Sequence, residues 1–227
     1  LPTLSGQRSR ADDPAFAGTL NWAIRSVLLI AIPATLALAV LAEPLLATLF
    51  QYGAFSGGDR AMAAASLRAY TLGLGAFMLV KVLAPGFYAR EDMRTPVRIG
   101  IIAMVANMVL NVAFVFPLMW WLNLGHVGLA LATSVSAWLN ALLLFRGLRR
   151  DAVLPRGSLP VKWLIKVGAA TAAMVSVLLL LMPDHAMWAE WLWWRRALEL
   201  GILCSVGLGV FGLSLLCCGV RPADLRR

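Results

Sequence analysis

Six polar side chains lie inside long apolar stretches of this sequence. They are Arg25, Arg68, Lys81, Asn107, Asn111 and Asn140. An ionisable side chain at the centre of a bilayer costs about 3 kcal/mol on insertion scales, so a residue of this kind indicates function by default. These six residues are therefore the candidates for lining a substrate cavity.

Each of the three cations also has a structural interpretation. The four methylenes of Lys81 could carry its ammonium to the lipid headgroups at the nearer end of its span, and Arg25 could reach an interface in the same way. Arg68 lies deeper, and its nearest partner in sequence is a weak one, Asp59 at the mouth of the helix. The sequence leaves both interpretations open.

The asparagines have an alternative of their own. Asn107 and Asn111 are four residues apart and therefore share one face of a helix. Amide side chains inside a membrane commonly hydrogen-bond to a neighbouring helix. The same structural explanation applies to Asn140.

Patterns typical of enzymes and metal sites do not occur in the apolar stretches. We find no paired carboxylates, no Gly-rich phosphate loop and no Ser-His-Asp set. Cys204, Cys217 and Cys218 have no metal-ligand spacing, which indicates small apolar packing residues. The sequence therefore predicts neither an enzyme nor a bound cofactor or metal.

The elements that must position the six candidates are predicted to be membrane-spanning helices. The chain is 61% hydrophobic and 14% charged, with a mean hydropathy of +0.81, whereas a soluble domain is about half apolar and a quarter charged. The apolar residues form blocks of the length that a helix needs to cross about 30 Å of hydrocarbon. We predict an all-α integral membrane protein with six spans, at roughly 18–42, 61–83, 97–118, 126–147, 161–182 and 196–218.

Turn-forming segments separate the predicted spans, at 51–59, 84–96, 148–160 and 182–190. Pro33 predicts a kink within the first span, and residues 44–51 are expected to form a short interfacial helix. The expected organisation is a cytoplasmic segment 1–17, four spans over 18–147, a basic cytoplasmic linker 148–160, two spans over 161–218 and a tail 219–227.

Charge asymmetry predicts the orientation, because cytoplasmic loops carry an excess of Lys and Arg. With residues 1–17 in the cytoplasm, three cations face outward, Arg60, Arg195 and Arg196, and fourteen face the cytoplasm. The fourteen are Arg8, Arg10, Arg90, Arg94, Arg98, Arg146, Arg149, Arg150, Arg156, Lys162, Lys166, Arg221, Arg226 and Arg227. Basic loops beside anionic lipid explain the net charge of +9 without a nucleic-acid partner.

The tryptophans are expected to form interfacial belts. Trp163 would lie at the inner interface. The outer belt would contain Trp120, Trp121, Trp188, Trp191, Trp193 and Trp194. The chain opens with Leu1 rather than Met, which favours a fragment of a longer membrane protein.

A long motif joins the second and third predicted spans. It runs VLAPGFYAR over 82–90 and continues EDMRTPVRIG to residue 100. We interpret it as a short cytoplasmic turn, with Thr95 as the cap and Pro96 in the first turn of the next helix. The turn-motif residues are Pro85, Gly86, Tyr88, Arg90, Thr95 and Pro96.

This motif, with LFQYGAFS at 49–56, resembles the MurJ/MviN family of bacterial lipid II flippases, part of the multidrug, oligosaccharidyl-lipid and polysaccharide exporter superfamily. LPTLS at the start, WAIR at 22–25 and GHVGLALATSVSAWLNALLL at 125–144 extend the resemblance over most of the chain. It implies that the six spans correspond to spans nine to fourteen, the C-terminal portion, of a fourteen-span inner-membrane protein with both ends in the cytoplasm.

The resemblance also implies a function. Such a protein moves the undecaprenyl-linked peptidoglycan precursor, lipid II, from the cytoplasmic to the periplasmic leaflet by alternating access. Cavity cations would suit the lipid pyrophosphate. Lys81 and Arg25 match positions where the family tends to be basic, whereas Arg68 matches none. Residues 161–218 correspond by position to two spans that form a groove for the lipid tail. The implied partners are lipid II, membrane lipids and proteins of wall synthesis.

Two other functions remain open at this point. An exporter of a drug or of another polysaccharide lipid is one, although an ion-coupled drug exporter would want a buried carboxylate, and Glu43 and Glu199 lie near span ends. The other is a scaffold that recruits wall-synthesis enzymes without transporting anything. A scaffold predicts that the loop charges matter and that Lys81 does not.

Overall fold

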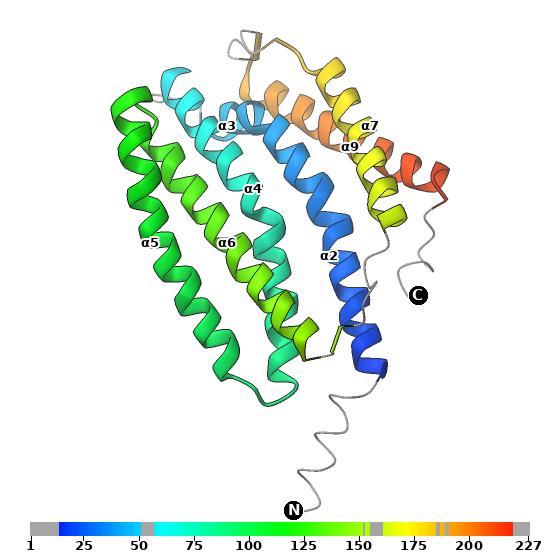
Figure 1. Cartoon of the computed structure of the whole chain (residues 1–227). Coiled ribbons are helices and arrows are strands. Elements are labelled where there is room, and N and C mark those ends of the chain that lie inside the picture. The colour runs from blue at the N-terminus through cyan, green and yellow to red at the C-terminus, as the bar shows by residue number, and fades with distance from the viewer. Residues whose placement is uncertain are drawn as a thin grey trace, which may run out of the picture.

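The computed structural model describes residues 14–50, 57–151, 153–154, 161–184, 187–188 and 191–219, and all regular structure within these ranges is helical (Figure 1). Six helices are long and apolar enough to cross a membrane, which confirms the prediction of an all-α protein with six spans. They are α2 (Pro14–Val40), α4 (Gly57–Tyr88), α5 (Arg94–Leu122), α6 (Gly125–Arg150), α7 (Val161–Leu181) and α9 (Trp193–Cys217).

The helices form a group of four and a pair. In the group, α5 packs on α6, α6 on α4 and α4 on α2, with α5 at the edge of the molecule (Figure 1). In the pair, α9 packs on α7, and α7 packs against α2. The short helix α3 (Ala42–Phe50) lies beside the end of α2 and touches both α4 and α9, so it joins the group to the pair.

Small residues allow the close approach of α4 and α6. Gly73 on α4 faces Ser134 on α6, whose hydroxyl donates a 2.7 Å hydrogen bond to the Ala69 carbonyl. Nearer the turn, an apolar cluster that includes Leu83, Phe87 and Leu148 fills the space between the helices. Close packing of this kind drives helix association in a membrane, where lipid is as apolar as the side chains.

The pair α7 and α9 has a separate core, and this core corrects the tryptophan prediction. Trp163 and Trp188 are buried in it, so assigning them to interfacial belts was wrong. The Trp188 indole N–H donates to the Thr48 hydroxyl on α3 at 3.3 Å. Its ring packs inside the protein core instead of facing lipid headgroups. Trp120, Trp121, Trp193 and Trp194 are exposed, as belts require.

The motif between α4 and α5 is mostly helical, contrary to the prediction of a loop over 84–96. Pro85, Gly86 and Tyr88 belong to the last turns of α4. Pro85 removes one backbone hydrogen bond there, but Gly86 is buried so closely that an added Cβ would lie 3.1 Å from Leu148 Cδ2. Contact with α6 therefore keeps the segment helical. Of the turn-motif residues, Arg90 alone lies in the turn itself.

The start of α5 also differs from the prediction. The helix begins at Arg94, so Thr95 and Pro96 both lie in its first turn, and Thr95 is not the cap. The Asp92 carboxylate accepts the backbone N–H of Arg94 at 3.1 Å and that of Thr95 at 3.0 Å. A side-chain oxygen placed before a helix satisfies N–H groups that have no partner within it.

Other predicted boundaries differ by a few residues or fall outside the described part. α2 ends at Val40, Pro33 lies within it, and α3 takes the place of the short helix expected at 44–51. α6 continues to Arg150, beyond the predicted start of the linker. Residues 1–13, 51–56, 155–160 and 220–227 lie outside the described residues, so the segments predicted there stay predictions.

Candidate functional site

A groove with several polar side chains lies between α4, α5 and α6. Its volume is about 450 Å³. Its polar lining consists of Lys81 from α4, Asn107 from α5, and Thr133, Ser136 and Asn140 from α6. Phe77, Met104 and small side chains complete the walls. We call it the polar groove.

The direction of α4 sets the level along the helix at which the Lys81 side chain begins. In an α-helix each Cα–Cβ bond tilts toward the N-terminus. The turn with Arg90 lies at the C-terminal end of α4, roughly 10 Å beyond Lys81 at the helical rise per residue. The Lys81 stem therefore starts out away from the turn and toward the level of Phe77, which also lines the groove.

Hydrogen bonds connect α5 to α6 beneath the polar groove. The Asn111 amide donates to Asn107 Oδ1 at 3.1 Å, and the Asn107 amide donates to Ser136 Oγ at 3.1 Å. The Ser136 hydroxyl in turn donates to the Thr133 carbonyl at 2.9 Å. The interhelical hydrogen bond considered for Asn107 is therefore observed. Asn111 supports Asn107 without lining the groove.

Arg68 lies away from the polar groove and has a different partner from the one considered in the sequence. Its Nη2 is 3.0 Å from Glu43 Oε1, and its Nε donates to the Ala39 carbonyl at 3.2 Å. Choosing Asp59 as its partner was wrong, because α3 folds back against α4 and brings a residue 25 positions away into contact. The pair is partly exposed and ties the corner between α2 and α3 to α4.

Arg25 is also separate from the polar groove. Its side chain is buried on α2 and is not part of the groove lining. The structure thus brings Lys81, Asn107 and Asn140 together and leaves both arginines elsewhere.

The sequence interpretation missed Thr133 and Ser136. They precede Asn140 by seven and four residues, so all three share one face of α6. This spacing could have indicated that the three residues line one site. It is a weak indication, because short hydroxyl side chains in apolar helices usually bond to their own backbone. Thr133 does so, donating to the Leu129 carbonyl at 2.9 Å.

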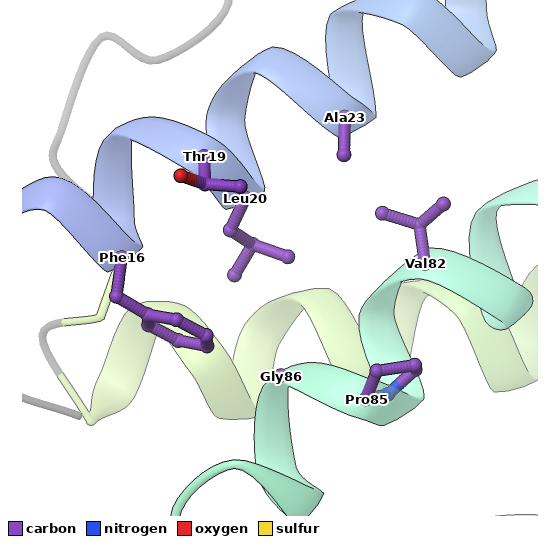
Figure 2. Close-up of a pocket in the computed structure, with 7 residues that line it drawn as sticks. All are labelled: Phe16, Thr19, Leu20, Ala23, Val82, Pro85 and Gly86. Atoms are coloured by element: carbon purple, nitrogen blue, oxygen red, sulfur yellow. The ribbon is translucent and has the colours of Figure 1, made fainter. Parts of the chain in front are cut away.

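A second pocket, of about 250 Å³, lies between α2 and α4 and is almost entirely apolar (Figure 2). Figure 2 shows Phe16 and Leu20 of α2 beside Pro85 and Gly86 of α4. Thr19 contributes the one hydroxyl of its lining. The pocket offers hydrophobic contact but no charge, so Pro85 and Gly86 serve packing here and the polar groove remains the candidate site.

The turn between α4 and α5 is fastened to the end of α6 by charge. Arg90 Nη1 lies 2.9 Å from Asp151 Oδ2. The Thr95 side chain, with the backbone N–H groups of Thr95 and Arg94, holds the pKa of Asp92 below its ordinary value, because these groups favour the ionised carboxylate. The nearby charge of Arg90 adds to the same effect.

Comparison with known proteins identifies the family. A family model described as lipid II flippase MurJ matches residues 1–196. This chain belongs to that family. A probable lipid II flippase MurJ of Vibrio cholerae is 45% identical over 226 residues, covering 100% of this chain and 42% of the relative. Another from Haemophilus influenzae is 40% identical over 99% of this chain and 44% of its own length.

A lipid II flippase MurJ of Burkholderia cenocepacia is 44% identical over 153 residues, which are 67% of this chain and 28% of that protein. The chain thus spans less than half the length of these curated MurJ relatives. That share agrees with six spans of a fourteen-span protein, as the family resemblance implied.

Proposed function

We propose that this chain is the C-terminal part of a flippase that moves lipid II from the cytoplasmic to the periplasmic leaflet by alternating access, for cell-wall synthesis. Family membership supports the reaction. The observation that carries the site is Lys81, an exposed cation on a membrane-spanning helix, in a groove shared with Asn107 and Asn140. No ion pair or hydrogen bond to Lys81 occurs among the described residues.

The chemistry of the groove suits an anionic headgroup. A lysine ammonium has three donors and no acceptor. A charge-assisted hydrogen bond from it to a phosphate oxygen contributes about 1.5–3 kcal/mol, roughly twice as much as a neutral one. Bringing a phosphate into the membrane without such a partner would be costly. Lys81 would offset part of that cost while the headgroup passes.

The proposed orientation follows the charges of the described helix ends. Arg90, Arg94 and Arg98 lie at the turn between α4 and α5, and Arg149 and Arg150 lie at the end of α6. The positive-inside rule places this end in the cytoplasm of a bacterial inner membrane, as it would both ends of the chain. The same basic surface is where wall-synthesis proteins would bind.

The other exporters have less support. An ion-coupled drug exporter needs a carboxylate available within its spans. Glu43 is engaged by Arg68, and Glu199 lies on α9, away from the polar groove. No carboxylate lines the polar groove between the described residues of α4, α5 and α6. Lipid transport through a cationic groove therefore fits the site better.

The first test is depletion of the full-length protein in living cells. Lipid-linked wall precursor at the outer leaflet should fall while the inner pool rises. If both pools hold steady, the proposed function is wrong and the scaffold becomes the leading explanation.

The second test is a lysine series in the full-length protein at normal expression. Lys81→Ala should impair transport, because the cation is lost, and Lys81→Arg should retain more activity. Lys162→Ala provides the matched control, since Lys162 is an exposed lysine on α7 outside the groove. Full activity of both Lys81 variants would contradict the role of Lys81.

A further inference from the structure

The three asparagines of α5 and α6 differ in what they bond to. Asn107 and Asn111 are both engaged in the chain of hydrogen bonds that ends at the Thr133 carbonyl. Asn140 lines the polar groove, and no hydrogen bond to its side chain occurs within the described part of the protein. The asparagines of α5 are therefore hydrogen-bonded within the protein, whereas the asparagine of α6 is not.

The neighbours of Asn140 on α6 bond to other groups. Ser136 lies one turn before Asn140 on α6, and its hydroxyl accepts the Asn107 amide and donates to the Thr133 carbonyl. Neither bond involves the Asn140 side chain. A polar group at membrane depth without a protein partner is unfavourable unless water or a ligand satisfies it.

Lys81 and Asn140 face one volume from two helices, with complementary capacities. An ammonium only donates, and as a compact point charge it attracts any phosphate regardless of what the phosphate carries. A carboxamide donates through its nitrogen and accepts through its oxygen. The second pattern matches a sugar hydroxyl or an acetamido group, each of which also donates and accepts.

We propose that Asn140 is the residue of the polar groove that recognises the sugar next to the phosphate bound by Lys81. Lys81 supplies attraction to the anion, and Asn140 supplies selectivity for a glycosylated lipid over the bare polyprenyl pyrophosphate. Asn107, Asn111 and Ser136 hold α5 against α6 and take no part in the recognition. This inference rests on the proposed function and specifies which side chain of the same groove makes binding selective for the glycosylated lipid.

The test measures binding of two lipids to the purified full-length protein. The probes are a polyprenyl pyrophosphate that carries a sugar and the same lipid without the sugar. Asn140→Leu should weaken binding of the glycosylated lipid about three- to tenfold, the range of a neutral hydrogen bond, and should leave the bare lipid unchanged. Lys81→Ala should weaken both lipids by a similar factor.

Asn111→Leu is the matched control, because it makes the same change at an asparagine outside the groove lining. It should lower thermal stability and leave the ratio of the two affinities unchanged. Asn140→Ala, which needs no extra space, repeats the measurement if the leucine variant unfolds.

Equal weakening of both lipids by the Asn140 variants, or weakening of neither, overturns the assignment. A changed ratio in Asn111→Leu overturns it as well, since selectivity would then follow helix packing. Failure of the proposed function has a different signature, because the unaltered protein would then bind neither lipid.

Discussion

Gly73 is the point at which a single added methyl group should separate α4 from α6. A Cβ at this position would lie 2.9 Å from both the Cα and the Oγ of Ser134, and 3.0 Å from Phe77 Cε2. Two of these three atoms belong to α6, and one of the two is backbone, which cannot rotate away. Gly73→Ala therefore requires a shift of the helix rather than of a side chain.

The expected cost has two parts. Overpacking a close-packed contact typically costs about 1–3 kcal/mol. Moving Ser134 also strains its hydrogen bond to the Ala69 carbonyl, which contributes about 0.5–1.5 kcal/mol. Replacing a helical glycine by alanine returns up to about 1 kcal/mol of helix propensity. The net result is a destabilisation of about 1–3 kcal/mol.

The assay is thermal or denaturant unfolding of the purified full-length protein, with Gly75→Ala as the matched control. Gly75 lies on the same helix, but a Cβ there would lie 3.5 Å from Trp138 Cζ2, an ordinary van der Waals distance. Gly75→Ala should be neutral or slightly stabilising. Because Phe77 lines the polar groove, Gly73→Ala should also reduce lipid binding.

Equal stability of the two variants would refute this reasoning. It would mean that α4 and α6 adjust their separation at little cost, so the close contact at Ser134 does not determine the width of the groove.

Three further predictions concern contacts outside the groove. Trp188→Phe keeps most of the ring but removes the donor to Thr48, and should cost about 0.5–1.5 kcal/mol in an unfolding experiment; no change would show that ring packing alone anchors this residue. Arg196→Met removes the 3.0 Å hydrogen bond to the buried Ala47 carbonyl, and should cost about 1–3 kcal/mol. Arg195 is exposed and its guanidinium lies 4.5 Å from the centre of the Trp191 ring, so Arg195→Met should cost only about 0.5–1 kcal/mol. Asp92→Ala removes the cap of α5 and should cost about 0.5–2 kcal/mol. The pKa of Asp92 in the folded protein is lowered from 3.8. The stability that its charge contributes is therefore present above pH 3.8 and is lost as the pH falls through the lowered pKa. The stability difference between Asp92→Ala and the unaltered protein should shrink accordingly in acid.

The helices were predictable because the length of apolar blocks determines where spans form. Where the chain packs against itself, this local signal failed. Pro85 and Gly86 have the composition of a turn, but contact with Leu148 holds them in α4. Trp188 has the position of a belt residue in the sequence, but it is buried in the core, where its indole donates to Thr48, 140 residues away. Distant partners of this kind are not visible in a local pattern.

The candidate site was predictable in part. Charge and amide groups in apolar stretches singled out three side chains that line one groove, namely Lys81, Asn107 and Asn140; their role in transport stays a prediction. The same rule also selected Arg68, which satisfies its charge on Glu43. The sequence could not distinguish a groove-lining residue such as Lys81 from an ion-paired one such as Arg68. It shows which polar residues a span contains, but not which neighbouring helix each one contacts.

The corner at α3 has a consequence for the order in which the protein assembles. Arg196 donates to the Ala47 carbonyl across 149 residues, and Trp188 reaches Thr48 across 140. During synthesis these partners emerge only after α4, α5, α6 and α7 have been made. The corner therefore stays incomplete until α9 enters the membrane. A chain cut short before α9 would lack Arg196 and its bond to this corner.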